Sequence, residues 1–418
     1  MSLHIRTHSW LRGQLSWSYV STRLCDAFER LGHNVYVIST NGIKNSDPYL
    51  TEEKMVSSLI GLEQLRRKSV PIDLDWCYTI PANFPKRFLP NSRYKAAIYN
   101  YETWKPGGNG WVDDWKKYYH LVDFYFPSSN FSAEIFYLNG IPKEKIFVIP
   151  HGVDTEVFNP YVKPIKLKTK KSMRFVAVLA PHYRKNIDIL LEAYCRAFTA
   201  KDDVCLVLKT KVYKHSDGIY HATNNPNGRK LFEVVIGDMF KKIYKKYGKN
   251  IPEIELLGGH VDNVCSIYTA CHCNISTSAC EGFYMPGIEA QAAGLINIGP
   301  NYSGHLDYMR KNNSLLINTK LREAGKFEQY WTVNKGSKAG QPDVDHTAEL
   351  MRYVYKNYDE LKKKFDPEMK KTVEQFSWTN AAKRIIDVMD GKLSHYVPGT
   401  YDLFNQHKTQ NHDNLKIY

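Results

Sequence analysis

The chain contains the stretch Glu281-Gly282-Phe283-Tyr284-Met285-Pro286-Gly287-Ile288-Glu289-Ala290. It follows a predicted strand, residues 272–276, and opens into a predicted helix, which is the strand-to-helix turn typical of α/β folds. Exposed backbone amides in such a turn bind anions and hydroxyl groups, so the carboxylate of Glu281 is expected beside a ligand. Glu289 lies about one turn into the helix, where its carboxylate can accept hydrogen bonds from two ribose hydroxyls. Taken alone, Glu289 is also explained as an acidic residue that stabilises a helix N-terminus by about 0.3 to 1 kcal/mol.

Strands and helices alternate on the amino-terminal side of this stretch. The predicted elements are strand 174–179, helix 187–198, and strands 204–209, 254–257 and 272–276. This alternation predicts a parallel sheet covered by helices. Two polar stretches, residues 212–229 and 321–345, are predicted to be surface excursions without regular structure. A late amphipathic helix is predicted at residues 379–389, followed by a polar tail.

A separate series of strands and helices occupies the first part of the chain. Strand 3–7, a loop containing Gly13, a helix and strand 34–39 form a strand-helix-strand unit. Short apolar runs follow at residues 95–99, 124–127 and 146–149, the continuous type expected of parallel strands buried on both faces. The polar, proline-bounded segment 159–172 is typical of a linker between domains.

The predicted fold is therefore α/β, with two Rossmann-like doubly wound domains. The predicted parts are an N-terminal domain with its linker at residues 1–172, a C-terminal domain at 173–376, and a helix with a polar tail at 377–418 that crosses back toward the first domain. Ligands of open parallel sheets bind outside the carboxyl ends of the strands. The active site is therefore expected in the cleft between the two domains.

Composition limits the class of protein. The chain has 418 residues, 43% of them hydrophobic, which excludes a small disulfide scaffold and a disordered chain. Because it has neither an apolar run of about eighteen residues nor an apolar start, a cytoplasmic protein is expected. A net charge of +14 favours phosphate-bearing partners, so peripheral binding to an anionic membrane surface is a further expectation. The lysine-rich runs are alternatively solvated helix faces.

Cysteines and histidines do not form a metal-binding pattern. The chain has 8 cysteines, scattered singly through apolar segments except for a cluster between residues 265 and 280, which favours reduced thiols. Cys271-His272-Cys273 lies in a predicted strand, where neighbouring side chains face opposite ways and cannot bind one ion together. No metal site is predicted.

The stretch at 281–290 resembles the signature of the retaining nucleotide-sugar glycosyltransferases of family 4, which have the two-domain GT-B fold. Further matching stretches occur in the expected order; they are Ile149-Pro150-His151-Gly152-Val153-Asp154, Phe158-Asn159-Pro160, Arg184-Lys185-Asn186-Ile187-Asp188, Ile267-Tyr268-Thr269-Ala270 and Phe376-Ser377-Trp378. The resemblance covers residues 95–390 well and the first 45 residues more loosely. It implies that the chain transfers a sugar from a nucleotide-diphosphate sugar, with retention of anomeric configuration, in glycan biosynthesis.

The resemblance implies a role for each residue of the carboxylate stretch. Glu289 matches the carboxylate that holds the donor ribose. Glu281, Gly282 and the amides of Phe283 and Tyr284 match the turn that faces the transferred sugar. Tyr284 departs from the glycine that is common in the family, so a bulky side chain at this position is expected to reshape the sugar pocket.

Cations are implied at the donor diphosphate. Arg184 and Lys185 match the family's basic pair, and fixed cations stabilise the negative charge that develops on a departing diphosphate. A cation pair at a helix start opposes the helix dipole unless an anion lies there, which supports this role. Lys209, at the carboxyl end of its predicted strand, is a weaker candidate for a donor contact.

Two candidate residues lie in the first domain. Gly13 falls where the family has a glycine-rich loop near the diphosphate, but with one glycine instead of two; it is alternatively an ordinary turn glycine. Glu102 stands where the family often has a histidine, and it resembles a subset with glutamate that positions the acceptor or the sugar. Glu102 is equally interpreted as a surface carboxylate in a loop.

The resemblance implies front-face attack, in which the acceptor hydroxyl passes its proton to a donor phosphate oxygen. No metal ion and no cofactor beyond the donor substrate are expected, because Arg184, Lys185 and helix N-termini can take the role of magnesium. A glycan or lipid-linked acceptor is the first candidate, and DNA bearing a modified base is the second. Competing hypotheses are an epimerase or hydrolase of the same fold and a noncatalytic basic protein that binds nucleic acid.

Overall fold

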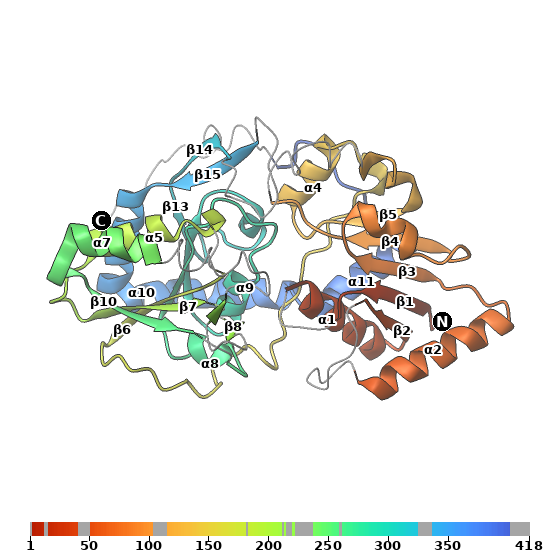
Figure 1. Ribbon diagram of the computed structural model, residues 1–418, viewed down its shortest axis with the longest axis horizontal. Helices are drawn as coiled ribbons and strands as arrows, with labels where there is room; N and C mark the ends of the chain where they lie inside the picture. The colour runs from red at the N-terminus through yellow and green to blue at the C-terminus, as the bar shows by residue number, and fades with distance from the viewer. Residues whose placement is uncertain are drawn as a thin grey trace. The chain divides into compact units, whose positions relative to one another are not determined.

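The computed structural model describes residues 2–11, 16–40, 51–102, 115–180, 183–210, 213–214, 220–221, 237–258, 261–324 and 337–401. The chain divides into two compact units, one formed by Met1–Gly152 with Phe376–Tyr418 and the other by Val153–Gln375. Each unit contains its own parallel sheet, as Figure 1 shows.

The first unit is built on a parallel sheet of five strands in the order β2-β1-β3-β4-β5. The strands are β1 (His4–Ser9), β2 (Asn34–Ser39), β3 (Leu74–Tyr78), β4 (Tyr94–Ile98) and β5 (Phe124–Phe126). Strand order reverses between β1 and β3, so the topological switch point of this sheet lies at their carboxyl ends. The apolar run 146–149 pairs with the sheet edge through a single bridge between Ile146 and Tyr125.

The α-helices of the first unit within the described residues (Figure 1) are α1 (Ser16–Arg30), α2 (Glu52–Arg67), α4 (Asn130–Leu138) and α11 (Trp378–Met389). Thr51, Ser129 and Ser377 precede α2, α4 and α11, and each side chain accepts a hydrogen bond from a backbone amide of the first turn. Such caps satisfy amides that a helix start leaves without partners. Helix α11 packs against α1, which attaches the end of the chain to the first unit.

The second unit contains a six-stranded parallel sheet in the order β10-β7-β6-β11-β12-β13. Its strands are β6 (Met173–Leu179), β7 (Val204–Thr210), β10 (Glu253–Leu257), β11 (Cys273–Ile275), β12 (Ile296–Pro300) and β13 (Leu315–Ile317). Numbered along the chain this is the order 3-2-1-4-5-6 of a dinucleotide-binding fold. The switch point lies between β6 and β11, which pair in register through Phe175 and Cys273.

Helices and two small hairpins complete the second unit. The helices are α5 (Ile187–Ala197), α7 (Asp238–Tyr247), α8 (Cys265–Tyr268), α9 (Met285–Ala292) and α10 (Val344–Gln375). Antiparallel pairs are formed by β14 (Thr319–Glu323) with β15 (Lys338–Pro342), and by β8 (Tyr213–Lys214) with β9 (Tyr220–His221). Short 3-10 turns lie at Pro81–Lys86, Tyr119–Leu121, Lys143–Lys145, Tyr183–Lys185, Gly248–Asn250 and Gly304–Asp307. Within the described ranges, no helix has the length and apolar character needed to cross a bilayer.

The predicted α/β architecture with two Rossmann-like domains is confirmed, and two details differ. Residues 321–345 are not a plain excursion, because their described ends contribute to β14 and form β15. The predicted linker 159–172 packs on the second unit, where Ile165 N donates to Ser266 O and the Glu255 carboxylate accepts from the amides of Lys168 and Thr169. These bonds satisfy its backbone, so the units divide at Gly152 and not near residue 172.

Candidate functional site

An ion-paired cluster lies at the switch point of the second sheet. Arg184 and Lys185 follow β6, and Glu281 follows β11, the neighbouring strand. Arg184 Nη1 lies 2.8 Å from Glu281 Oε2, and Lys185 Nζ pairs with Glu281 Oε1. Arg184 and Glu281 are 9% and 4% exposed, so water screens their attraction little. The sequence-predicted residues Arg184, Lys185 and Glu281 therefore meet at one point.

Hydrogen bonds to backbone carbonyl oxygens connect the loop after β6 with the loop after β11. Ala279 N donates to Arg184 O at 2.7 Å, and the Thr277 hydroxyl donates to Asn186 O at 2.9 Å. On the other side of Glu281, its amide donates to the Ser303 hydroxyl oxygen at 3.0 Å. The carboxylate is thus fixed through its own backbone as well as through the cations, which preorganises the cluster.

The charges of the cluster decide the ionisation of its carboxylate. Burial raises the pKa of Glu281, but the positive charges of Arg184 and Lys185 outweigh burial and lower that pKa well below its ordinary value. Glu281 is therefore ionised at every physiological pH. Arg184, Lys185 and Glu281 together carry a net charge of one positive unit, and positive charge at a sheet edge attracts anionic ligands.

Non-glycine residues with strained, positive φ angles lie beside this cluster. The described residues contain four non-glycine residues with positive φ, of which Asn186 (46°), Tyr284 (70°) and Ser303 (86°) adjoin the cluster. A non-glycine residue in this region costs about 1 to 3 kcal/mol, and such residues concentrate at functional sites. Their grouping at this edge of the sheet is the pattern expected of a functional site.

The side chain of Tyr284 is buried in the interior of the second unit. Its ring is 5% exposed, and its hydroxyl lies 3.2 Å from Asn274 Nδ2 on β11. Its carbonyl oxygen accepts a hydrogen bond from the Tyr308 hydroxyl. Lys185 Nζ lies 6.0 Å from the centre of the Tyr284 ring. The ring therefore lies beneath the cation and supports the turn, instead of filling a pocket in front of it.

The rest of the carboxylate stretch leads into α9. Gly282 and Phe283 are buried between Glu281 and the helix, and the Phe283 ring packs 5.2 Å from that of Tyr308. Glu289 is half-buried on α9 and accepts a hydrogen bond from the Tyr268 hydroxyl at 3.2 Å. This contact orients the carboxylate.

Lys209 lies at the same edge of the sheet. It is the second-to-last residue of β7, which neighbours β6, and pairs in register with Val178. The side chain is 6% exposed, and burial lowers the pKa of its ammonium group. Lys209 adds a further cation at the carboxyl ends of the strands.

One candidate residue of the first unit, Glu102, lies beyond the carboxyl end of a strand. Glu102 is half-buried and follows β4, whereas Gly13 lies outside the described residues. Burial raises the pKa of Tyr78, the Asn100 side chain lowers it, and the charge of Glu102 raises it again. Glu102 follows β4, and Tyr78 ends the neighbouring strand β3.

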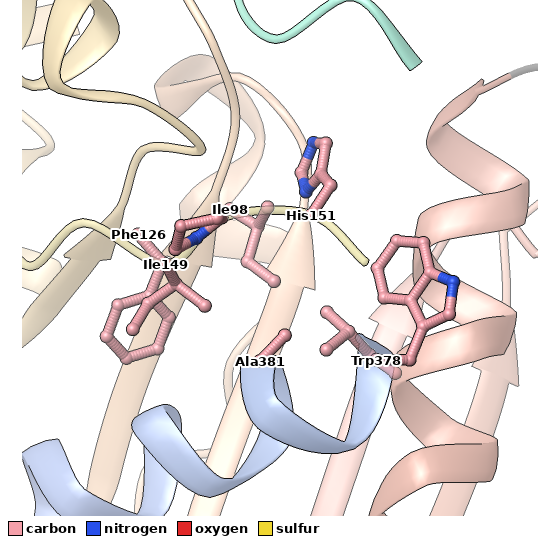
Figure 2. Close-up of a pocket in the computed structure, with 8 residues that line it drawn as sticks. Ile98, Phe126, Ile149, His151, Trp378 and Ala381 are labelled. Carbon is pink, nitrogen blue, oxygen red and sulfur yellow. The ribbon is translucent and has the colours of Figure 1, made fainter. Parts of the chain in front are cut away.

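A buried histidine lies close to these residues. Figure 2 shows His151 beside a small apolar pocket lined by Ile98, Phe126 and Ile149 from the sheet side and by Trp378 and Ala381 from α11. The pocket is too small to hold a water molecule, so it is a packing gap and not a ligand site. Burial lowers the pKa of His151 to about 3, which keeps its imidazole neutral.

Several residues of the cluster were not predicted. The Ser303 hydroxyl accepts a hydrogen bond from the Glu281 amide, and the Tyr268 hydroxyl donates one to Glu289. The His305 ring lies within hydrogen-bond distance of the Ser303 hydroxyl and of the Pro300 carbonyl oxygen. Ser303 and His305 come shortly after β12, a strand that the sequence analysis did not predict, and a position after a strand is the signal that could have found them. Among the described residues, no group of three or more His, Cys, Asp or Glu side chains is placed to hold a metal ion.

Comparison with known proteins identifies the fold. No protein-family model and no curated protein matches the chain. Among solved structures it aligns with a glycosyltransferase from Rickettsia africae (14% identity, TM-score 0.60, 93% of this chain and 98% of that one). It also aligns with Anabaena HepE in complex with UDP and glucose (11% identity, TM-score 0.62, 93% of this chain and 99% of that one). A third aligned structure is a sucrose-phosphate synthase from Thermosynechococcus elongatus (13% identity, TM-score 0.60, 93% of this chain and 98% of that one). The two Rossmann-like domains are therefore those of the GT-B glycosyltransferase fold.

Proposed function

We propose that this protein is a retaining glycosyltransferase that moves a sugar from a nucleotide-diphosphate sugar to a hydroxyl group of an acceptor. The observation that carries the proposal is the cluster at the second switch point, where two cations converge on one buried carboxylate. This arrangement holds Arg184 and Lys185 in fixed positions with surplus positive charge, at the place where a doubly wound sheet binds its ligand.

In the proposed reaction, the bond between the sugar anomeric carbon and the donor phosphate oxygen breaks. The acceptor oxygen forms its bond to the same face of that carbon, and its proton passes to a phosphate oxygen of the departing nucleotide diphosphate. Arg184 and Lys185 stabilise the negative charge on the leaving group without a metal ion or cofactor. Glu281 keeps the two cations in place, with its own charge already satisfied by them.

Glu289 is proposed to hold the donor ribose. Its carboxylate is half-buried on α9 and accepts a hydrogen bond from the Tyr268 hydroxyl, and carboxylate oxygens accept hydrogen bonds from ribose hydroxyls. The solved Anabaena HepE structures contain UDP with glucose, and UDP-glucose. Uridine diphosphate sugars are therefore the first donors to test.

The acceptor class proposed first is a glycan or lipid-linked glycan. The net charge of +14 supports an acceptor that carries anionic groups or lies at an anionic surface. DNA with a modified base is the alternative that the same charge supports.

Calorimetry of nucleotide binding tests the donor site. UDP, GDP, ADP and their common sugar conjugates are titrated into the wild type, Glu289→Ala and the double variant Arg184→Ala/Lys185→Ala. The matched control is Arg66→Ala/Arg67→Ala, which removes two exposed cations of α2 that pair with Glu63. We expect one nucleotide to bind the wild type and the control equally, and the two site variants at least about tenfold more weakly.

Two results would contradict the proposal. The first is full nucleotide affinity in a folded Arg184→Ala/Lys185→Ala variant, because the cations would then lie outside the donor site. The second is release or epimerisation of the sugar as the sole reaction, with no transfer in any acceptor screen, because this result identifies a hydrolase or epimerase.

A further inference from the structure

Two tryptophan side chains of the first unit are unusually exposed. Trp10 is 42% exposed and Trp17 is 37% exposed, whereas the other described tryptophans, Trp76, Trp115 and Trp378, are all buried. Tryptophan carries a large apolar surface, and neighbouring exposed aromatic residues mark sites of binding. Two exposed tryptophans close together are therefore a candidate binding surface.

The two tryptophans lie at the switch point of the first sheet. Trp10 directly follows β1, Trp17 lies in the first turn of α1, and Tyr78 ends β3. The Trp17 and Tyr78 rings are stacked, with centres 5.2 Å apart and planes 12° from parallel. The Trp10 ring centre lies 6.5 Å from that of Trp17. The place where an open α/β sheet binds its ligand is thus covered by aromatic rings.

Buried residues hold this aromatic surface rigid. Tyr78 is 3% exposed, and its ring lies 6.2 Å from that of His151. His151 in turn stacks on Trp378 at 6.0 Å. Because the stack is anchored in the interior of the unit, a ligand that binds Trp17 does not have to order it first.

A carboxylate lies at the same edge of the sheet. Glu102 follows β4, which neighbours β3 and pairs with it in register through Ile98 and Tyr78. A carboxylate accepts hydrogen bonds from hydroxyl groups and repels phosphate. Exposed tryptophan rings, with planes 56° apart, at the same sheet edge as a hydrogen-bond acceptor match a pyranose ring, which has a face of C–H groups and a rim of hydroxyls. This arrangement does not match a nucleic acid, whose bases stack but whose phosphates need cations.

We infer that Trp10, Trp17 and Glu102 form a subsite for a pyranose ring of the acceptor. The ring stacks on the tryptophans, and Glu102 accepts hydrogen bonds from its hydroxyls. The assignment of this ring to the acceptor rests on the proposed function, in which Arg184, Lys185 and Glu289 of the second unit bind the donor nucleotide. Binding of the ring itself does not depend on that function.

Saturation-transfer NMR on the full chain detects weak sugar binding and tests the subsite. The probes are the methyl glycosides of glucose, galactose and mannose, together with lactose and maltose, each with and without UDP. We expect transfer to the C–H protons of one face of at least one probe. This transfer should fall at least about fivefold in Trp10→Ala/Trp17→Ala and in Glu102→Gln, and Trp17→Tyr should keep most of it because a stacking ring remains.

The matched control is Tyr161→Ala, which removes a side chain that is 92% exposed in the second unit and should leave the transfer unchanged. UDP affinity separates the two proposals. If UDP binds neither the wild type nor the tryptophan variants while sugars bind the tryptophans, the donor assignment fails and the subsite stands.

Three outcomes overturn the subsite. One is the absence of transfer to every sugar probe in the wild type. Another is transfer that survives in Trp10→Ala/Trp17→Ala. The third is binding of a single-stranded oligothymidine that depends on these tryptophans and exceeds binding of every sugar, because the aromatic surface would then be a base-stacking site.

Discussion

Arg184 Nη1 and Glu281 Oε2 lie 2.8 Å apart, although the two residues belong to loops that follow different strands, β6 and β11. These strands are neighbours because the order of the sheet reverses between them. Lys185 pairs with the second oxygen of the same carboxylate, so one buried anion fixes two cations. The contact is therefore a consequence of topology, and it decides where positive charge is available to a ligand.

Glu281→Gln tests this arrangement through stability. The change leaves Arg184 and Lys185 beside each other without their carboxylate, and breaking a buried ion pair in this way costs about 3 to 5 kcal/mol. We expect a clearly lower thermal midpoint, with a larger recovery on addition of pyrophosphate than in the wild type, because the added anion replaces the lost charge. Glu63→Gln, which removes an exposed carboxylate paired with Arg66 and Arg67, should change the midpoint little. An unchanged midpoint in Glu281→Gln would show that the three charges do not depend on one another.

The sequence predicted those site residues whose position follows from the local order of apolar runs and loop residues. Glu281, Glu289, Arg184 and Lys185 stand at strand-to-helix turns, and such turns are visible in the order of apolar runs and loop residues. Their meeting at one edge followed from the rule that parallel strands end at the same side.

The remaining features depend on contacts that no local pattern reports. The Ser303 hydroxyl reaches the Glu281 amide, and Tyr268 reaches Glu289, from parts of the chain whose placement requires the folded sheet. The inward direction of the Tyr284 ring depends in the same way on Asn274. The division at Gly152 was missed because a polar, lysine-rich segment has the composition of a linker even when Glu255 binds its backbone.

Gly152→Ala tests the contact between the two segments of the first unit, since the first segment ends at Gly152 and the second begins at Phe376. A Cβ at this position would lie 2.5 Å from the Ser377 carbonyl carbon and against the backbone nitrogen of Trp378. Backbone atoms at the start of α11 cannot move without displacing the helix, so we expect a loss of about 2 to 3 kcal/mol, the upper range for overpacking. Gly237→Ala, where a Cβ meets nothing within 4 Å, is the matched control. Chemical denaturation of both variants measures the difference, and equal stabilities would contradict the close approach.

His151 makes stability depend on pH. Burial lowers its pKa to about 3, against 6.5 for the unfolded chain, so below pH 6.5 the unfolded state binds a proton that the folded state does not. Stability from this group is complete above about pH 6.5 and is lost as the pH falls toward 3. We expect the stability advantage of the wild type over His151→Gln to shrink by about 2 to 3 kcal/mol between pH 7.5 and 4.5. Denaturation midpoints at the two pH values measure this change, and a constant advantage would mean that the imidazole titrates normally.

Substitutions of Tyr284 test whether the buried contacts of its side chain stabilise the strained turn. Tyr284→Phe keeps the buried ring and removes the hydroxyl that contacts Asn274, a loss of about 0.5 to 1.5 kcal/mol. Tyr284→Gly relieves the positive φ of 70°, worth about 1 to 2 kcal/mol, but removes a buried aromatic ring, which costs about 3 to 5 kcal/mol. The expected order of urea midpoints is therefore wild type, then Phe, then Gly. A glycine variant as stable as the phenylalanine variant would show that the ring contributes nothing, and that Tyr284 faces the ligand and not the interior.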